Sequence, residues 1–323
     1  MARTDLWKYC GAEQCREMML SFGLIGAGDW PPEKIMGCLY ALSNHAEKHY
    51  QKVQIPKRSG GFRTLLVPDP LLKHVQRNLL HHVLDGFTVS ASAAAYRKGA
   101  SVAANAAMHQ GRKIVMKMDI EDFFGSITFP MVLHHVFPAD RFPPSVGVML
   151  ASLCCCYDRL PQGAPTSPAI SNLVMKPFDE YMEAWCGERE ITYTRYCDDM
   201  TFSGVFDVSE VKGKVYGFLR SMGFEPNTKK TRILTRRTRQ VVTGLVVNDR
   251  VQVPAPYRRR LRQEIYYCMK YGAKEHLRRT GRLAYLKDGD AGTRRYLQSL
   301  LGKTAYVLLA SGDGDAWFRE AQA

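Results

Sequence analysis

The sequence predicts an α+β fold rather than a doubly wound parallel sheet. Strand-forming runs and helical segments alternate irregularly along the 323 residues, whereas a doubly wound sheet needs a regular repeat of strand and helix. Two segments, 53–68 and 191–203, have the pattern of β-hairpins. The residues from 251 onward are instead helical and rich in arginine. We therefore expect a mixed body followed by a basic, helical C-terminal part.

The expected elements can be placed in order along the chain. Residues 1–50 are mixed and helical, with a break at Pro31-Pro32. The basic hairpin at 53–68 turns at a Gly-Gly pair, because glycine adopts the backbone angles that tight turns require. Helices are expected at 71–84, 130–137, 145–156, 167–185 and 208–222, and strands at 114–118, 231–235 and 240–247, the last two as a pair.

Charge and composition limit the classes of function. Lysine and arginine number 45 against 31 aspartate and glutamate, a formal net charge of +14. A globular protein this basic usually meets a polyanion, and nucleic acid is favoured over a membrane surface. The alternative is a merely soluble basic protein. No stretch has the apolar length of a membrane span, and the residues from Met1 to Lys8 lack the apolar core of a secretory signal.

The nine cysteines indicate neither disulfides nor zinc. They form no paired Cys-x-x-Cys spacing, and three of them are contiguous, Cys154 to Cys156, within an apolar segment. Free cysteine in such a segment behaves as a small buried hydrophobe. We therefore expect a reducing, cytoplasmic location.

One short motif points to chemistry: Tyr196-Cys197-Asp198-Asp199 lies between two strand-forming runs. This arrangement places both aspartates in a tight hairpin turn at the edge of a sheet. Adjacent carboxylates at a fixed backbone point are unfavourable unless something positive binds there. A divalent metal suits them, and acidic ligands combined with substrate phosphates suit Mg²⁺. Aspartate is also a common turn residue, so a plain surface turn is the alternative.

A third carboxylate, Asp119, follows the apolar strand expected at 114–118. Taken alone, it could equally be a helix cap. Together with Asp198 and Asp199 it would suffice to hold two metal ions, provided the fold brings the three together. Two ions close together can stabilise both the attacking and the leaving oxygen of a phosphoryl displacement.

In combination, these segments resemble a reverse transcriptase. Asp119 is followed by the aromatic pair Phe123-Phe124, then by the proline-rich segment 160–168 (LPQGAPTSP), then by the Tyr-x-Asp-Asp motif. The resemblance assigns Asp119, Asp198 and Asp199 to the family's catalytic, metal-binding triad. It implies two Mg²⁺ ions, with Mn²⁺ as a possible substitute.

The resemblance runs from about Val53 to about Asn248 and implies the right-hand polymerase fold with fingers, palm and thumb. The palm would be an antiparallel sheet that carries the Tyr-x-Asp-Asp hairpin. The expected domains are 1–118 for the N-terminal helices and fingers, 119–250 for the palm, with a segment at about 130–165 contributing to the fingers, and 251–323 for a helical basic thumb.

Other residues match the family's nucleotide pocket one by one. Phe124 occupies the place of an aromatic gate that would clash with a ribose 2′-OH and favour dNTPs, while one member of the Phe123-Phe124 pair is expected to be core. Gln162 and Gly163 match the segment that contacts the incoming nucleotide. The basic residues that the resemblance implicates are Arg63 and Lys57 for the triphosphate, and Lys230 near the pyrophosphate leaving group, with Lys229 left open as its alternative.

Two further segments resemble signatures of bacterial retron reverse transcriptases. One is Asn105-Ala-Ala-Met-His109, and the other is Val242-Thr243-Gly244. The resemblance implies that they bind RNA, although each alone could be an ordinary helix turn or strand end. Cys197 departs from many relatives, which carry alanine there; both are small, so activity should be retained.

The C-terminal helical part adds a candidate RNA surface. Arginines interleaved with tyrosines combine phosphate binding with stacking, which is how single-stranded RNA is typically read. The alternative is a solvated amphipathic helix. The candidate RNA-binding residues here are Tyr257, Arg258, Arg259 and Arg262.

The retron resemblance implies a specific activity. The enzyme would use a 2′-OH of its own structured non-coding RNA as primer and copy part of that RNA into branched multicopy single-stranded DNA (msDNA). It implies dNTPs, the RNA and the DNA product as partners, with a separate effector protein in anti-phage defence. The alternatives are a group II intron-like or abortive-infection reverse transcriptase, the former disfavoured because no maturase extension is seen, or an inactive RNA-binding scaffold.

Overall fold

The computed structural model describes residues 7–26, 28, 30–57, 60–311 and 315–321. Two predicted features lie partly outside this range. They are the first six residues of Met1 to Lys8, considered above as a possible secretory signal, and residues 58–59 of the basic hairpin. Within the described residues, no helix has the length and apolar character needed to cross a bilayer.

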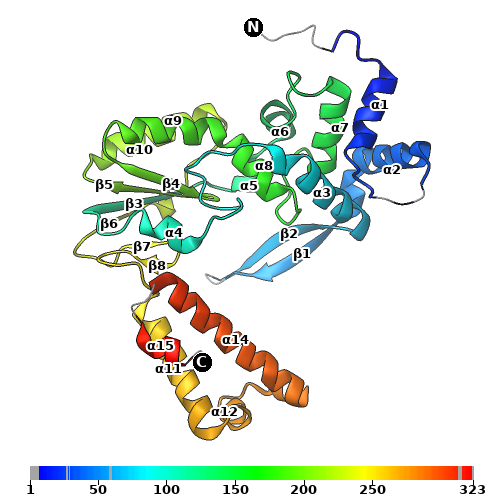
Figure 1. Cartoon of the computed structure of the whole chain (residues 1–323). Coiled ribbons are helices and arrows are strands. Elements are labelled where there is room, and N and C mark those ends of the chain that lie inside the picture. The colour runs from blue at the N-terminus through cyan, green and yellow to red at the C-terminus, as the bar shows by residue number, and fades with distance from the viewer. Residues whose placement is uncertain (1–6, 27, 29, 58–59, 312–314, 322–323) are drawn as a thin grey trace.

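The N-terminal part is helical and carries a long hairpin (Figure 1). Strands β1 (Tyr50–Pro56) and β2 (Phe62–Pro68) pair antiparallel, as expected for a hairpin, and most of β1 is exposed. After β2, the Asp69 side chain caps helix α3 (Pro70–His82) by accepting from the backbone N–H of Leu72. The other helices of this part are α1 (Ala12–Ser21), α2 (Pro32–Asn44), η1 (Ala46–His49), η2 (Leu84–Gly86) and α4 (Val102–Ala107).

A four-stranded antiparallel sheet with the order β4-β5-β3-β6 forms the palm. Its strands are β3 (Ile114–Asp119), β4 (Thr192–Tyr196), β5 (Asp199–Gly204) and β6 (Arg232–Thr235). Helices α9 (Lys176–Gly187) and α10 (Val208–Ser221) lie on one face, and α4 lies on the other (Figure 1). Successive side chains of β3 point to opposite faces of the sheet. Met116 packs into the core under α9 and α10, and Val115 packs into the core on the opposite face.

The helices between β3 and β4 complete the main core. They are α5 (Phe123–Ser126), α6 (Phe129–His135), α7 (Pro144–Cys154) and α8 (Ser167–Val174). Cys154, Cys155 and Cys156 are free and buried, as predicted for small hydrophobes, and burial raises the pKa of the Cys154 thiol to about 12. Fingers and palm therefore share one continuous hydrophobic core.

Two sequence predictions need correction. The single helix expected at 167–185 is two helices, α8 and α9, because Pro177 cannot continue a helix and restricts the residue before it. The expected strand pair at 231–235 and 240–247 does not form. Instead β6 joins the palm sheet, while β7 (Val241–Val242) and β8 (Leu245–Val246) make their own short hairpin.

The C-terminal part is helical, as predicted for a thumb. It contains α11 (Ala255–Tyr271), α12 (Ala273–Arg279), α13 (Leu283–Leu286), α14 (Gly289–Ser311) and α15 (Ala316–Glu320). These helices pack around a second core, which also includes Val242, Leu245 and Val247 from the region of hairpin β7–β8. The hairpin is therefore the structural link between palm and thumb.

Candidate active site

The Tyr196–Asp199 motif forms a two-residue turn between β4 and β5. Tyr196 and Asp199 are paired across the hairpin, and Cys197, with φ of 62°, lies in the left-handed region. The prediction that both aspartates lie in the turn is correct for Asp198 only, since Asp199 is the first residue of β5. The two carboxylates are thereby fixed at adjacent backbone positions at one end of the sheet.

The sheet brings the third carboxylate to the same place. Asp119 ends β3 and is the register partner of Asp199, and the backbone N–H of Ile120 donates to the carbonyl of Asp198 at 3.2 Å. Burial raises the pKa of Asp119, and the nearby Asp198 charge adds to this rise. Burial likewise raises the pKa of Asp199. The structure thus confirms that the three aspartates are neighbours.

Two lysines compensate this negative charge. Lys230 Nζ lies 2.8 Å from Asp119 Oδ2, and Lys117 Nζ lies 2.6 Å from Asp199 Oδ2. Lys230 lines the same cavity as the aspartates and Lys229 does not, which answers the question that the sequence left open. Lys117 was missed, although strand alternation places a residue two before Asp119 on the same face.

The donor set suits divalent ions by its chemistry. Among the described residues, no three His, Cys, Asp or Glu side chains are already gathered around one ion position. In this structure Asp119 and Asp199 are turned towards their lysines instead. Carboxylate oxygens are the ligands that hard divalent cations prefer. Asp119, Asp198 and Asp199 are therefore the residues that would hold metal, after turning from the lysines.

A cavity of about 840 Å³ opens in front of the carboxylates. Lys57 and Arg63 reach it from hairpin β1–β2, and Gln162 from the proline-rich loop. Phe123 and Phe124 both line it; Phe124 is partly buried, whereas Phe123 is 4% exposed and packs into the core. The cavity therefore joins basic, polar and aromatic side chains from separate segments to the catalytic turn.

Gly163 has a backbone role rather than a place in the cavity wall. Its φ is 130°, and an added Cβ would lie 2.8 Å from the carbonyl oxygen of Leu66. The neighbouring carbonyl of Gln162 accepts from the backbone N–H of Leu66 at 2.9 Å. Glycine is thus required for the loop to dock on β2, and this docking fixes Gln162 at the cavity.

Tyr96 and Arg159 are among the cavity residues that sequence reasoning missed. Tyr96 has a left-handed φ of 57° and lies beside the catalytic turn. The Arg159 guanidinium donates to the carbonyl of Gly125, which ties the loop after α7 to the segment that carries Phe124. The left-handed conformation of Tyr96 leaves no signal in the sequence that pattern reasoning could detect.

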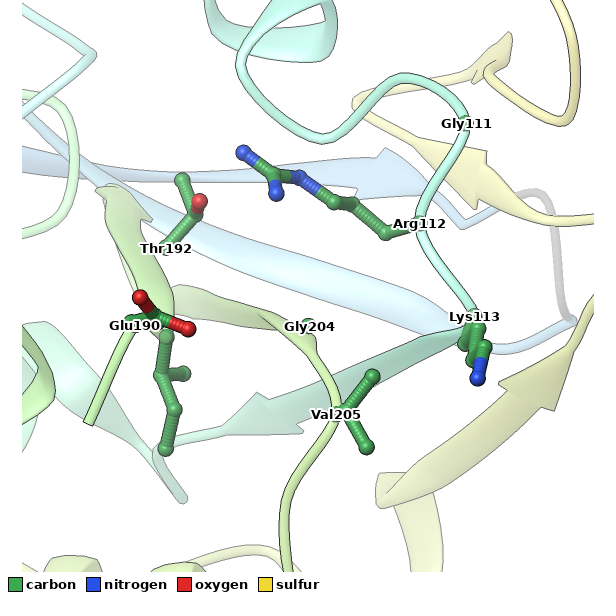
Figure 2. A pocket seen from close by; sticks show the side chains of 8 residues that line it. Gly111, Arg112, Lys113, Glu190, Thr192, Gly204 and Val205 are labelled. Carbon is green, nitrogen blue, oxygen red and sulfur yellow. The ribbon is translucent and has the colours of Figure 1, made fainter.

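A second cavity, of about 660 Å³, lies at the opposite end of the palm sheet. Figure 2 shows its polar side chains, among them Arg112, Glu190 and Thr192, around the start of β4 and the end of β5. None of the three aspartates and none of the predicted nucleotide-pocket residues lines it. The larger cavity is therefore the candidate active site.

Comparison with known proteins agrees with this geometry. The family described as reverse transcriptase (RNA-dependent DNA polymerase) matches residues 55–264, which is more than half of the chain. The chain belongs to the reverse transcriptase family. Members of this family use divalent metal ions, in agreement with the oxygen donors found here.

Relatives place this reverse transcriptase among those of retrons. It is 35% identical over 264 residues to the retron Mx65 reverse transcriptase of Myxococcus xanthus, covering 74% of this chain and 61% of that protein. It is 32% identical over 246 residues to the retron Ec86 reverse transcriptase of Escherichia coli, covering 75% and 76%. Among solved structures, a Candida albicans telomerase aligns with a TM-score of 0.48 at 12% identity, over 84% of this chain and 62% of that one.

The two named residues of the first retron segment of the reverse transcriptase are buried in the palm. Asn105 is 3% and His109 0% exposed. The ring nitrogens of His109 lie 2.7 Å from Ser203 Oγ and 2.8 Å from Thr194 Oγ1, and burial lowers the pKa of His109 to about 3. In this structure neither side chain offers a surface to RNA. His109 joins the segment after α4 to strands β4 and β5.

The second retron segment is the turn of hairpin β7–β8. Val242 is buried, whereas Thr243 and Gly244 form the turn with φ of 46° and 86°. The Thr243 hydroxyl donates to the carbonyl of Val102 at 3.1 Å, so the turn is tied to the start of α4. The side chain of Val242 is a packing residue, and the turn alone reaches the surface.

The arginines of α11 divide into two groups. Arg258 and Arg262 contact Asp315, at 3.5 and 2.8 Å, and Arg262 also lies over the ring of Trp317. They bind α11 to the segment before α15. Arg259 is exposed and Tyr257 is 39% exposed. Arg262 is exposed as well, but its guanidinium is already engaged by Asp315.

Proposed function

We propose that this reverse transcriptase uses a 2′-OH of its own structured non-coding RNA as primer and copies part of that RNA into branched msDNA. The observation that carries the proposal is the meeting of Asp119, Asp198 and Asp199 with Gln162 in one cavity of a chain related to retron enzymes. Such a site supports nucleotidyl transfer, which depends on positioning and charge neutralisation more than on a strong base.

Each group of residues has a distinct part in the proposed reaction. Asp119, Asp198 and Asp199 would hold two Mg²⁺ ions, or Mn²⁺ in their place, at the end of the sheet. Such ions would supply activation of the attacking hydroxyl and stabilisation of the leaving oxygen. Arg63 and Lys57 bind the triphosphate of the incoming dNTP. Gln162 contacts the incoming nucleotide.

Lys230 serves the leaving group in this proposal. Its ammonium lies beside Asp119 in the structure and is released when that carboxylate turns to metal. A cation at this point neutralises the charge that develops on pyrophosphate or donates a proton to it.

The alternatives receive less support. The curated relatives described above are retron enzymes, which favours a retron role over an intron-like or abortive-infection one. An RNA-binding scaffold without activity has no physical reason to keep three clustered carboxylates beside nucleic acid. A separate effector protein in anti-phage defence remains part of the proposal through the retron kinship.

The decisive experiment is to isolate low-molecular-weight nucleic acid from cells that express the gene with its flanking DNA. We expect single-stranded DNA that stays attached to RNA through a 2′–5′ branch, which a debranching enzyme releases. DNA without such a branch, or no DNA at all, would contradict the proposal.

Phe124 is expected to set the choice of sugar. The Phe124→Ala enzyme should incorporate ribonucleotides at least about tenfold more often relative to dNTPs, because the ring that would meet a 2′-OH is gone. Primer extension with mixed nucleotide pools measures this ratio. Tyr157→Ala is the matched control, since it removes another ring from the same cavity. An equal change in both variants would remove Phe124 from this role.

Arg259 is expected to contribute to RNA binding through phosphate contact. Arg259→Gln should weaken binding of the cognate RNA and reduce the slope of log K against log salt by about one. Filter binding across a salt series measures both quantities. Arg220→Gln, on the exposed surface of α10, is the control. Equal salt slopes for Arg259→Gln and wild type would place the RNA surface elsewhere.

A further inference from the structure

A fully buried ion pair lies directly beneath the catalytic turn. Arg195 and Asp179 are both 0% exposed, and their closest approach is 2.5 Å, from Nη2 to Oδ2. A second bond joins Arg195 Nε to Asp179 Oδ1 at 2.8 Å. Asp179 comes from α9, and Arg195 is the residue of β4 that precedes Tyr196. The pair therefore links the helical layer to the strand that carries the motif.

Stability alone does not explain this pair. Burying two charges has a large desolvation cost, and replacing such a pair by apolar residues of similar volume often leaves a protein equally or more stable. What apolar side chains cannot supply is directed hydrogen bonding. The guanidinium has five N–H donors in a fixed plane, so it can hold several groups in one geometry.

The other hydrogen bonds of the Arg195 guanidinium go to the catalytic turn and to Asn172. Nη1 donates to the backbone carbonyl of Cys197 at 2.9 Å, and Nη2 donates to Asn172 Oδ1 at 3.2 Å. The carbonyl of Cys197 belongs to the peptide group that leads into Asp198. A shift of the guanidinium would therefore move the peptide that carries the first metal-binding carboxylate of the turn.

The same junction holds the loop that ends at Tyr96. The backbone N–H of Arg195 donates to the carbonyl of Ser92 at 2.8 Å, and the carbonyl of Arg195 accepts from the backbone N–H of Ala94 at 2.7 Å. Asn172 Nδ2 donates to the carbonyl of Ala95 at 2.8 Å. The next residue, Tyr96, lines the active cavity beside the turn. Turn and loop are thus set in place by one shared set of buried polar groups.

We propose that Arg195 and Asp179 are positioning residues for DNA synthesis, which fix the Cys197–Asp198 peptide and hence the carboxylates of the catalytic turn. The inference rests on the proposed polymerase function. It assigns the pair to geometry rather than to global stability. Replacing the pair should therefore loosen the turn and slow the reaction, even where the fold remains intact.

Two variants separate these roles. The double variant Asp179→Leu with Arg195→Met replaces the pair by apolar residues and removes both the bond to Cys197 and the acceptor of the buried Tyr193 hydroxyl. Arg195→Lys keeps a positive charge beside Asp179 but lacks the planar fork. Leu219→Ala, a fully buried change on α10 away from the turn, is the control for general destabilisation.

Two readouts are needed, one of which is independent of activity. Hydrogen exchange followed by mass spectrometry should show at least about tenfold faster exchange of the peptide containing residues 197–199 in both variants, but not in Leu219→Ala. Steady-state extension should show kcat lowered by about 10²-fold. The KM for dNTP should stay within about threefold, because Arg63 and Gln162 lie on other elements.

The outcomes are distinguishable. Folded variants whose turn exchanges as slowly as wild type, or no faster than in Leu219→Ala, would overturn the proposal. If neither variant folds, the pair has only a structural role, and the proposal is overturned as well. A wild-type enzyme that does not extend a primer would contradict the proposed function, while the exchange experiment would still decide the positioning role.

Discussion

Replacing Asp198 and Asp199 together by asparagine is expected to abolish DNA synthesis, with a loss of at least about 10³-fold. Asparagine keeps the shape of the turn but removes the anionic oxygens that hold divalent ions. The measurement is primer extension on an RNA template with saturating dNTPs. Binding of the cognate RNA should stay within about threefold, because the proposed RNA surface lies on the thumb.

A charge-matched control separates metal binding from net charge. Asp140→Asn with Asp249→Asn changes the same two charges at exposed positions outside the active cavity. We expect this control to extend primers at the wild-type rate. Retained extension by the Asp198 and Asp199 variant would contradict the mechanism outright.

Lys230→Met is expected to lower kcat by about 10²-fold. Of the adjacent lysines 229 and 230, only Lys230 lines the active cavity. The change therefore removes a positive charge from that cavity. The reaction then loses the cation proposed to serve the pyrophosphate leaving group. Pre-steady-state incorporation of a single nucleotide measures the effect on the chemical step.

Lys229→Met provides a closely matched control. Lys229 is on the same short 3₁₀ turn, η3 (Thr228–Lys230), and carries the same charge. We expect its rate to stay within about twofold of wild type. If both variants lost activity equally, the effect would belong to the basic turn as a whole and Lys230 would have no special role.

Much of the site could be predicted because short sequence patterns show where the strands that carry the aspartates begin and end. A strand, a two-residue turn and a second strand are visible around Asp198, and the apolar run before Asp119 marks a strand end. The ladder that pairs Asp119 with Asp199 is not visible locally. It was anticipated through the family resemblance, which supplies long-range information that periodicity lacks.

The predictions that were wrong or missing also concern contacts between residues far apart in the sequence. The positioning role proposed for Arg195 could not be predicted, because nothing in the sequence shows that it is buried against Asp179. Asn105 and His109 were assigned to RNA, yet a motif does not reveal whether a side chain contacts a ligand or packs inside. Short strands such as β7 and β8 are held by tertiary contacts rather than by propensity, so their pairing partners could not be predicted.

The hairpin β7–β8 has a practical consequence for building chimeric enzymes. Its residues Val242 and Leu245 share a hydrophobic core with Leu261 and Tyr296 of the helices that follow. A donor thumb joined at residue 251 would meet foreign side chains across that core, with cavities or overlaps as the result. The exchangeable module therefore begins before Val241, and grafts that include the hairpin should retain the parent melting temperature more closely than grafts that omit it.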